Sequence, residues 1–343
     1  MRYVITGGSG YIGSRLVDHL SRRQDVQRIV ICDLQPPRHY KPKTGFKRLD
    51  VRDREAVRAT LEEANADVLV HLAFILDPIH DEHLMYDVDV NGTRNVLEAA
   101  SLAGTQQVLV TSSSTAYGAF ADNPEPITEE HPVRGVASFS YGRDKTESDR
   151  LCQLWALEHP DRTMTIVRPC IVFGPNVDNY IVRLWTNAPF QVDAGQLDNK
   201  IQFVHEDDVV EAIIGLLHGR HAGAYNVAGD GLMTLRECAE LTGSPIRKMP
   251  LAAYRLLGRL FWALRISEAP PGQIEFAVHP WIVTADKLKE TGWTPRYTSR
   301  QTFEITMRAH DKLPAGGPAP PTVTGTGEPE PVATLAAEGS PGR

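Results

Sequence analysis

The feature that most constrains how this chain folds is a glycine-rich turn near its start. The segment Thr6–Gly13 has the sequence TGGSGYIG, in which Gly7 begins a G-x-x-G-x-x-G pattern and Gly8 begins G-x-G-x-x-G. A short apolar run that predicts a strand precedes the turn, and residues 12–22 have the spacing of a helix. Glycines at such a junction let backbone N–H groups approach a pyrophosphate at the positive end of the helix. The turn therefore predicts a dinucleotide site, with contacts from Gly7, Gly10, Tyr11, Ile12 and Gly13.

Strand and helix patterns alternate beyond this turn. Short segments rich in apolar residues predict strands at residues 3–6, 28–32, 46–49, 68–71, 108–111 and 164–168, and the second of these contains a continuous apolar run. Helical spacing of apolar residues predicts helices at residues 12–22, 53–63, 90–100 and 141–158. Because such alternation places helices on both faces of a parallel sheet, we expect an α/β fold with a doubly wound parallel sheet of the Rossmann type.

The pattern divides the chain into three parts. We assign residues 1–170 to the Rossmann domain, with some later segments returning to it, and residues 171–312 to a smaller C-terminal substrate domain. Residues 313–343 contain seven prolines, six glycines and no aromatic residue, so we expect a disordered tail. The alternative is that its Pro-rich pieces are a peptide ligand for a partner. Within the second part the alternation loosens into separate pieces, including a helix at 207–218, a strand at 224–227 and a helix at 251–266.

Composition and charge exclude several classes of protein. The 343 residues include 36 Lys and Arg against 43 Asp and Glu, a formal charge of −7. This balance is opposite to the basic excess of nucleic-acid binders, so we expect a small-molecule substrate and no nucleic-acid partner. No run approaches the ~20 apolar residues of a membrane span, and no signal-peptide pattern is present. With four scattered cysteines and no C-x-x-C pair, we expect buried thiols in a cytoplasmic protein.

A carboxylate closes the second predicted strand. Asp33 follows Gly13 by 20 residues, a position from which a carboxylate accepts both ribose hydroxyls of an adenosine and repels a 2′-phosphate. The spacing therefore predicts NAD rather than NADP as the cofactor. Two observations weigh against this: Asp33 could be a turn residue at a strand end, and Arg38 lies close downstream.

Two side chains suited to proton transfer lie on one predicted helix. Tyr141 and Lys145 are four residues apart, so both project from the same face. An ammonium beside a phenol favours the phenolate, so we expect Lys145 to lower the pKa of Tyr141 and Tyr141 to exchange a proton with an alcohol. A Y-x-x-x-K pair alone is common by chance. The hydroxyl-rich segment 111–115 strengthens the interpretation, because it follows a predicted strand at the edge where doubly wound sheets bind ligands.

The order of these motifs resembles the extended short-chain dehydrogenase/reductases, also called the NAD-dependent epimerase/dehydratase family, and especially members similar to UDP-glucose 4-epimerase. The resemblance extends over most of the chain before the predicted tail. Its motifs are TGGSGYIG, LDVRD at 49–53, HLA at 71–73, VNGTRNVLEAA at 90–100, SSS at 112–114, YG at 117–118, Tyr141 with Lys145, RP at 168–169, FGP at 173–175, FVHEDDV at 203–209, YNVAG at 225–229 and GW at 292–293.

The resemblance implies how several of these residues act. Spacing back from Tyr117 makes Ser113 the catalytic hydroxyl, so that the implied catalytic residues are Ser113, Tyr141 and Lys145. The resemblance also implies NAD as the cofactor and a homodimer that pairs through the predicted helices 90–100 and 141–158. The implied cofactor contacts outside the glycine turn are Asp33, Asp50 and Val51 at the adenosine, Leu72 and Ala73 along the groove, and Tyr141 with Lys145.

Three positions depart from the family pattern. Dehydratases of the family carry Asp-Glu after the catalytic hydroxyl, where this chain has Ser114 and Thr115, so we do not expect a dehydratase. Ile171 stands where relatives that use nucleotide sugars carry an Asn that contacts the substrate diphosphate. Asp89 replaces an Asn before the V-x-G-T motif, and the sequence suggests no function for that change.

Three other features of the sequence have a structural interpretation. We expect the segment His80–His83, with two His and two acids, to be a solvated turn rather than a metal site. We expect the acids of the segment 205–208 to cap a helix. The predicted helix 251–266 is amphipathic, and we expect it to pack in the second domain, although a membrane-surface helix or a lid is an alternative.

Together these expectations describe an NAD-dependent oxidoreductase that removes hydride from a secondary alcohol. If the ketone stays bound and hydride returns to its other face, the enzyme is an epimerase, and a nucleotide-sugar-type epimerase is the reading we favour. If the ketone leaves, it is a dehydrogenase or reductase of a hydrophobic alcohol, as for a hydroxysteroid or dihydroflavonol. A non-catalytic NAD-sensing module is the remaining alternative, because a fold does not establish activity.

Overall fold

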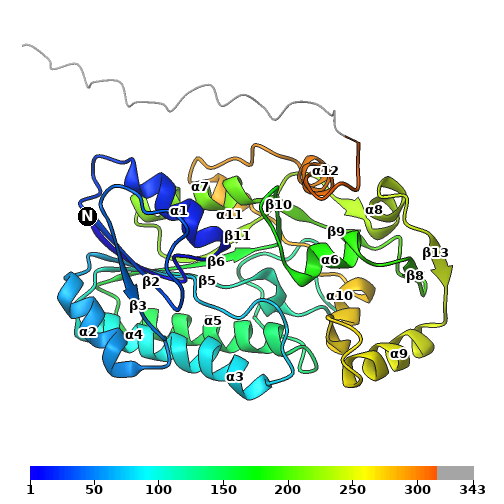
Figure 1. The fold of residues 1–343 in the computed structure, drawn as a ribbon, viewed down its shortest axis with the longest axis horizontal. Helices are drawn as coiled ribbons and strands as arrows, with labels where there is room; N and C mark the ends of the chain where they lie inside the picture. The colour runs from blue at the N-terminus through cyan, green and yellow to red at the C-terminus, as the bar shows by residue number, and fades with distance from the viewer. Residues whose placement is uncertain (315–343) are drawn as a thin grey trace, which may run out of the picture.

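A seven-stranded parallel sheet forms the centre of the molecule (Figure 1). The computed structural model describes residues 1–314. The strand order β11-β6-β5-β4-β1-β2-β3 reverses direction at β1, as a doubly wound sheet requires, so the predicted fold class is confirmed. The strands are β1 (Arg2–Thr6), β2 (Arg28–Asp33), β3 (Thr44–Arg48), β4 (Val68–His71), β5 (Gln107–Thr111), β6 (Thr163–Pro169) and β11 (Gly223–Val227).

Helices cover both faces of this sheet (Figure 1). On one face lie α1 (Tyr11–Ser21) and α7 (Glu206–His218), and on the other lie α2 (Arg54–Ala64), α4 (Gly92–Leu102) and α5 (Ser140–Glu158). The central strand shows why apolar runs predict this arrangement: Val4 pairs with Val30 and Leu69 in parallel register, and Val4 and Ile5 are fully buried on opposite faces.

The structure differs from the predicted element boundaries in a few places. The predicted strand 46–49 is β3, which begins earlier, because its edge position leaves its residues only half-buried and without an apolar run. A π-helical turn, η1 (Asp87–Asn91), leads directly from α3 (Glu82–Tyr86) into α4, so the helical region begins before Val90. The predicted strand at 224–227 is β11, which pairs with β6 at the edge of the large sheet.

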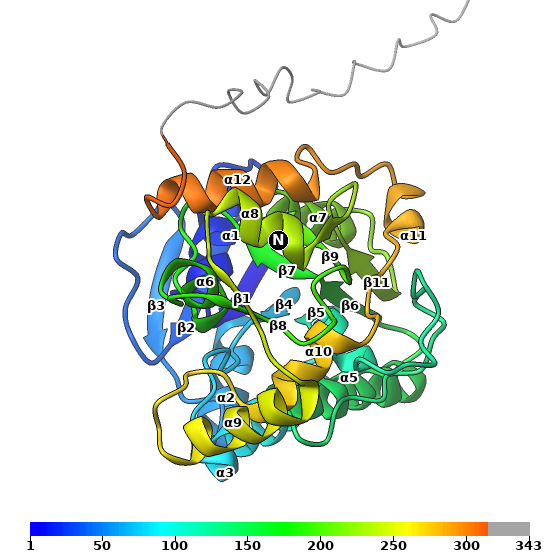
Figure 2. The same cartoon turned by 90° about the vertical axis from the view of Figure 1, so that its right-hand side faces the viewer.

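The second domain stands at the carboxyl ends of the sheet strands, and its elements face the viewer in Figure 2. Its small strand pairs are β10 with β7, β12 with β9 and β13 with β8. Those strands are β7 (Ile171–Phe173), β8 (Gln191–Asp193), β9 (Lys200–Ile201), β10 (Phe203–His205), β12 (Met233–Thr234) and β13 (Ile246–Lys248). Its helices are α6 (Tyr180–Thr186), α8 (Leu235–Leu241), α9 (Leu251–Ala263), η3 (Pro271–Gln273), α10 (Ile274–Val278) and α12 (Ser299–Ala309). Helix α11 (Asp286–Lys289) instead packs against β11 of the large sheet, and its Leu288 belongs to the core of that sheet.

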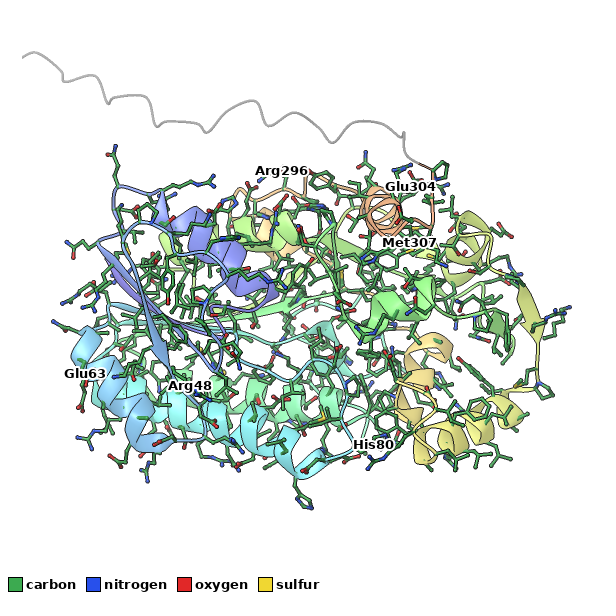
Figure 3. All side chains as sticks on the ribbon, viewed as in Figure 1. Arg48, Glu63, His80, Arg296, Glu304 and Met307 are labelled. Atoms are coloured by element: carbon green, nitrogen blue, oxygen red, sulfur yellow. The ribbon has the colours of Figure 1, made fainter. Side chains whose placement is uncertain are left out.

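Aromatic side chains hold this second domain together. Phe173 stacks on Phe203 with ring centroids 4.9 Å apart, and Trp185 meets Phe303 edge-on at 5.5 Å. Met307 points from α12 into the same core (Figure 3). The core therefore joins the separate strand pair of β7 and β10 to α12, the last helix described.

The C-terminal elements can be compared with two further predictions. The predicted helix 251–266 ends earlier, as α9 at Ala263, and Arg265 adopts a left-handed φ of 58° just beyond it. Within residues 1–314, no helix is long and apolar enough to cross a membrane. Leu313 packs against the second-domain core, while residues 315–343 of the predicted disordered tail lie outside the described residues.

Candidate active site

A cavity of about 650 Å³ extends along the carboxyl ends of the sheet strands to the second domain. Its walls include every residue that the sequence predicted for the site. These are Ser113, Tyr141 and Lys145, with Gly7, Gly10, Tyr11, Ile12, Gly13, Asp33, Asp50, Val51, Leu72 and Ala73. The structure thus brings the predicted residues together, and the function of each stays a prediction.

The glycine turn forms one end of the cavity from backbone alone. Gly7 has a left-handed φ of 69°, and its N–H donates to the carbonyl of Cys32 at 2.9 Å. A Cβ on Gly7 would lie 2.7 Å from the backbone N of Ala73, and a Cβ on Gly13 would lie 2.7 Å from the Cα of Gly8. Side chains at these positions would fill the cradle, so its shape fits a pyrophosphate approached by backbone N–H groups.

Two carboxylates line the adenosine end of the predicted cofactor site. Asp33 ends β2, and its Oδ2 accepts from the N–H of Ser9 at 3.1 Å, which holds the carboxylate against the glycine turn. Asp50 accepts from the guanidinium of Arg52 at 2.6 Å, and this hydrogen bond lowers the pKa of Asp50. Both carboxylates are hydrogen-bond acceptors on the cavity wall, as the predicted contacts with an adenosine require.

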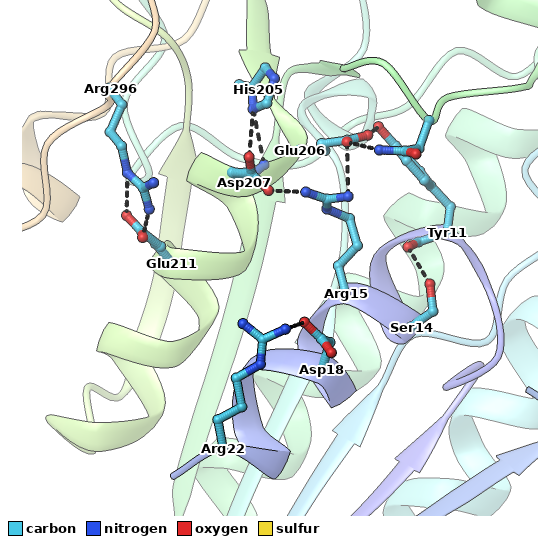
Figure 4. Close-up of polar contacts among 11 residues, drawn as sticks. Tyr11, Ser14, Arg15, Asp18, Arg22, His205, Glu206, Asp207, Glu211 and Arg296 are labelled. Atoms are coloured by element: carbon cyan, nitrogen blue, oxygen red, sulfur yellow. Dashed lines mark hydrogen bonds and ion pairs between the residues drawn. The ribbon is translucent and has the colours of Figure 1, made fainter. Parts of the chain in front are cut away.

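A network of charges connects helix α1, which begins at the glycine turn, to helix α7 (Figure 4). The Tyr11 hydroxyl donates to Glu206, and Arg15 pairs with Glu206 at 3.1 Å and also with Asp207. Glu206 is fully buried at the start of α7, so it needs these partners. The network therefore fixes helix α1, which begins at the glycine turn, against the helix that covers the same sheet face.

The helix entry at residues 205–208 has the structural function that the sequence predicts, with one correction. The cap of α7 is the side chain of His205, whose Nδ1 accepts from the N–H of Asp207 at 3.2 Å. The carboxylates were expected to cap the helix, but they bind elsewhere. Asp208 accepts from the backbone N–H groups of Arg296 and Tyr297, at 3.1 and 3.2 Å.

The three predicted catalytic side chains meet beside the end of β5. Ser113 follows that strand and begins the turn η2 (Ser114–Tyr117), where its Oγ accepts from the N–H of Thr115 at 3.1 Å. Tyr141 and Lys145 project from the first turns of α5, and both are buried. The Lys145 Nζ donates to the carbonyl of Thr111 at 2.7 Å and lies 3.3 Å from the ring centroid of Phe74.

The electrostatics of Tyr141 correct one expectation from the sequence. Burial raises the pKa of the Tyr141 hydroxyl above its usual value, hydrogen bonding to Ser113 lowers it by less, and the charge of Asp89 raises it again. Lys145 was expected to lower this pKa. Its ammonium instead donates to Thr111 and lies 5.8 Å from the Tyr141 ring centroid, so the protein alone keeps Tyr141 protonated.

Asp89 lies in the π-helical turn η1, and its charge acts on both Tyr141 and Lys145. Its side chain is fully buried, Oδ1 accepts from the N–H of Ile75 at 2.8 Å, and Oδ2 has no hydrogen-bond partner among the described residues. Burial raises the pKa of Asp89, and the charge of Lys145 lowers it by less. Burial likewise lowers the pKa of Lys145, which Asp89 opposes. The Asp that replaces the family Asn is therefore electrostatically coupled to the lysine of the triad.

The opposite end of the cavity has mainly apolar walls. Its side chains come from the loops around α3 and α5, from β7 and α6, and from the region of η3 and α10. They are Leu76, Phe139, Ile171, Tyr180, Phe276 and Trp281, with two amides, Asn179 and Gln273. Gln273 Oε1 is buried with no hydrogen-bond partner within residues 1–314, so it is available to a polar group of a substrate.

The cations that a diphosphate would need lie elsewhere. Among the described residues that line the cavity, only Arg52 and Lys145 are cationic, and Arg52 pairs with Asp50. Arg183 is already bound to three carboxylates, those of Asp77, Asp178 and Glu268, at 2.7 to 3.0 Å. Lys200 instead lies 3.4 Å from Glu125, outside the cavity walls.

The segment His80–His83 has separate contacts for its side chains. Asp81 caps α3 by accepting from the N–H of Leu84 at 3.0 Å, and Glu82 pairs with Arg143 at 3.0 Å. His80 stacks on Trp262 with ring centroids 4.0 Å apart. No group of three or more possible ligands gathers anywhere in the described part of the chain.

Sequence reasoning missed much of the cavity wall, and four of the missed residues show why. Phe74 immediately follows the HLA motif, so extending that motif by one position would have found it. Gln273, Phe276 and Trp281 lie in a segment without a motif, and only the fold brings them to the site.

Fold and site together define the chain as a dinucleotide-binding α/β protein with a paired Tyr and Lys at the end of its cofactor groove. The chain belongs to the NAD-dependent epimerase/dehydratase family, whose model matches residues 3–228. This confirms the resemblance to the extended short-chain dehydrogenase/reductases, and the predicted cofactor is the cofactor of that family.

Individual relatives agree with this assignment. The chain is 29% identical over 308 residues to an uncharacterized protein, y4nG, of Sinorhizobium fredii, covering 87% of this chain and 76% of that one. It is 30% identical over 256 residues to N-acetyl-alpha-D-glucosaminyl-diphospho-ditrans,octacis-undecaprenol 4-epimerase of Escherichia coli O157:H7, covering 72% and 73%. Its fold is similar to that of Thermus thermophilus UDP-glucose 4-epimerase in complex with NAD, with a TM-score of 0.70, 23% identity, and 91% and 99% of the two chains covered.

Proposed function

We propose that this chain is an NAD-dependent oxidoreductase that removes hydride from a secondary alcohol whose non-reacting part is largely uncharged. The observation that carries the proposal is the meeting of Ser113, Tyr141 and Lys145 with the glycine cradle in one cavity. A module that only sensed NAD would have no need of the three groups at the point where the cofactor groove meets a second, apolar chamber.

The side chains divide the chemistry between them. When bound, NAD supplies the hydride acceptor. Tyr141 takes the alcohol proton as its phenolate and becomes the neutral phenol, and Ser113 holds the same substrate oxygen. Lys145 stays fixed by the Thr111 carbonyl beneath the ring of Phe74, where Asp89 sustains its charge. Burial keeps the Tyr141 hydroxyl protonated in the protein alone. We therefore infer that Tyr141 becomes a proton acceptor only when the site also holds the positive charge of oxidised NAD.

The apolar chamber supports the choice of substrate class. A buried diphosphate without donors loses its hydration with no compensation, and neither Ile171 nor Arg183 offers it a free donor. An uncharged ring, by contrast, would pack against Phe139, Phe276 and Trp281.

A nucleotide-sugar-type epimerase is the second candidate. The 30% identical relative is a 4-epimerase of a diphosphate-linked sugar by name, and the fold is similar to that of a UDP-glucose 4-epimerase. The amides of Asn179 and Gln273 are the groups in the chamber that suit sugar hydroxyls. In this candidate the ketone stays bound until hydride returns to its other face.

Single-turnover reduction of NAD tests the proposal. Purified protein with NAD is mixed with a panel of uncharged cyclic alcohols and of nucleotide sugars, and NADH formation is followed by absorbance. We expect transient or net NADH with at least one uncharged alcohol. NAD that survives purification and is released on denaturation would support the epimerase, whereas bound NAD with no reduction by any alcohol would support the sensor and contradict the proposal.

We also infer that the chain pairs as a homodimer through α4 and α5. Leu102 on α4, and Leu154 and Leu157 on α5, are more than half exposed, which is unusual for three leucines on adjacent helices. Light scattering after size exclusion should show a dimer for the wild type and a monomer for Leu157→Glu. A monomeric wild type would contradict this inference.

A further inference from the structure

Helix α9 carries apolar residues around most of its circumference, but the rest of the protein leaves part of that surface exposed. Ten of its thirteen residues are apolar, all thirteen are described, and none is buried. A helix that is apolar around most of its circumference is normally enclosed by other elements or by lipid. The helix also lies beyond residue 228, where the family model ends. It is therefore a surface element of this chain that the oxidoreductase site does not explain.

The inward face of α9 is already occupied by protein. A Cβ on Gly258 would lie 2.8 Å from Cδ1 of Ile274, so the helix packs closely on α10. Trp262 stacks on His80, which lies at the lower edge of the molecule in Figure 3. These contacts fix the orientation of the helix and leave its opposite face outward.

The outward face carries large apolar side chains. Leu256 and Leu260, one helical turn apart, are 66% and 48% exposed. The exposed face continues through Phe261, Leu264 and Ile266, which extend it past the end of the helix. A contiguous group of this kind marks an interaction surface, whereas single exposed leucines do not.

Exposed cations without an ion-pair partner among the described residues lie on this helix, just after it and on the strand before it. Arg259 and Arg265 are exposed and form no ion pair with any described residue, and the same is true of Arg247 and Lys248 on β13, just before the helix. Arg255, in contrast, pairs with Glu275 at 2.8 Å on the side of α10. The chain as a whole carries a formal charge of −7, so this concentration of free positive charge is local.

We propose that α9 binds the surface of an anionic phospholipid bilayer, with Leu256, Leu260 and Phe261 inserted among the acyl chains. Cationic side chains at the edge of an apolar helix face reach up to phosphate headgroups while their stems cover apolar surface. The charge complements an anionic membrane, since each cation near such a surface adds to the attraction. Figure 2 shows α9 beside α10, which contributes Phe276 to the cavity, so docking places the substrate chamber next to the lipid.

A second copy of the chain fits this surface less well. A two-fold contact over this face would bring Arg259 and Arg265 of both copies into one interface, where their like charges repel. An anionic bilayer avoids that conflict, and it also takes apolar side chains without requiring a complementary shape.

Flotation of the full chain with lipid vesicles tests the proposal, and it needs no substrate. The vesicles contain phosphatidylcholine alone or phosphatidylcholine with phosphatidylglycerol. We expect binding to the anionic vesicles that weakens as salt is added. It should fall by about tenfold or more in Leu256→Ser/Leu260→Ser and in Arg259→Glu/Arg265→Glu. The matched controls, Leu232→Ser at a leucine 45% exposed elsewhere and Arg28→Glu at an exposed arginine, should bind as the wild type does.

Three results would overturn it. One is no binding to anionic vesicles, or equal binding to both compositions. A second is unchanged binding in both double variants, with their unfolding temperatures and NAD affinity equal to wild type. The third is a sedimentation experiment in which Leu256→Ser/Leu260→Ser dissociates an oligomer, which would assign the face to a second copy.

Discussion

The two ends of the cavity are built from different parts of the chain. At the cofactor end, backbone of the glycine turn forms the part of the wall predicted to hold the pyrophosphate, and the approach of Gly13 to Gly8 leaves no room for a Cβ. At the substrate end, side chains as far apart in the sequence as Leu76 and Trp281 form the wall. The first end is suited to phosphate and ribose, and the second to an uncharged ring. A local motif thus indicates the cofactor, while the substrate depends on the fold.

The largest effect that we expect separates chemistry from binding. Tyr141→Phe keeps the ring and removes the hydroxyl that exchanges the proton, so turnover should fall by about 10² or more. NAD affinity, measured by fluorescence titration, should stay within a small factor of wild type. Tyr3→Phe is the matched control, because it removes a buried tyrosine hydroxyl at a position that does not line the cavity. If Tyr141→Phe turned over at the wild-type rate, the triad assignment would be wrong.

The cofactor end should be intolerant of a single added methyl. In Gly13→Ala the new Cβ meets the backbone of Gly7 and Gly8, so the turn must shift, at a cost of about 1–3 kcal/mol in unfolding free energy. NAD affinity should fall by about tenfold or more, because the displaced turn no longer aims its N–H groups at the pyrophosphate. Gly215→Ala on α7, where a Cβ meets nothing within 4 Å, is the control. Equal NAD affinity in the two variants would contradict the prediction that the glycine turn holds the pyrophosphate of the cofactor.

A smaller effect is expected at the adenosine. Asp33→Ala removes charge-assisted hydrogen bonds to the ribose, each worth about 1.5–3 kcal/mol, and removes the repulsion of a 2′-phosphate. The preference for NAD over NADP should therefore narrow by about tenfold, as measured by titration with both reduced cofactors. Asp161→Ala, at an exposed carboxylate, should leave the ratio unchanged. Tighter binding of NADPH than NADH by wild type would instead point to Arg38.

The smallest effect concerns pH. A negative charge raises the pKa of any proton-bearing group beside it, and Asp89 does so for both Tyr141 and Lys145. Removing that charge in Asp89→Asn should lower both pKa values, so the whole profile of kcat/KM against pH should move to lower pH by about one unit. Asp87→Asn, in the same turn with an exposed side chain, should not move it. A shift to higher pH would contradict the coupling.

The same contrast explains what could be predicted from the sequence. Gly7 and Asp33 belong to motifs whose spacing along a strand and a turn is local, so the cofactor end and the parallel sheet could be predicted from the sequence. Gln273 and Phe276 have no motif, and only tertiary packing brings them to Tyr141. The pKa of Tyr141 could not be predicted either. Tyr141 and Lys145 are neighbours on one helix face, but burial raises the tyrosine pKa and Lys145 points toward Thr111 instead.

Thermal unfolding with added ligands tests most directly whether the two ends differ as described. With NAD present throughout, UDP, GDP and dTDP are compared with a panel of uncharged cyclic alcohols. A ligand at about 100 times its Kd stabilises the folded state by about 2.7 kcal/mol, which is readily measured as a rise in Tm. We predict a saturable rise with at least one uncharged alcohol and none with any nucleoside diphosphate. A saturable rise with one nucleoside diphosphate and none with the alcohols would contradict the account.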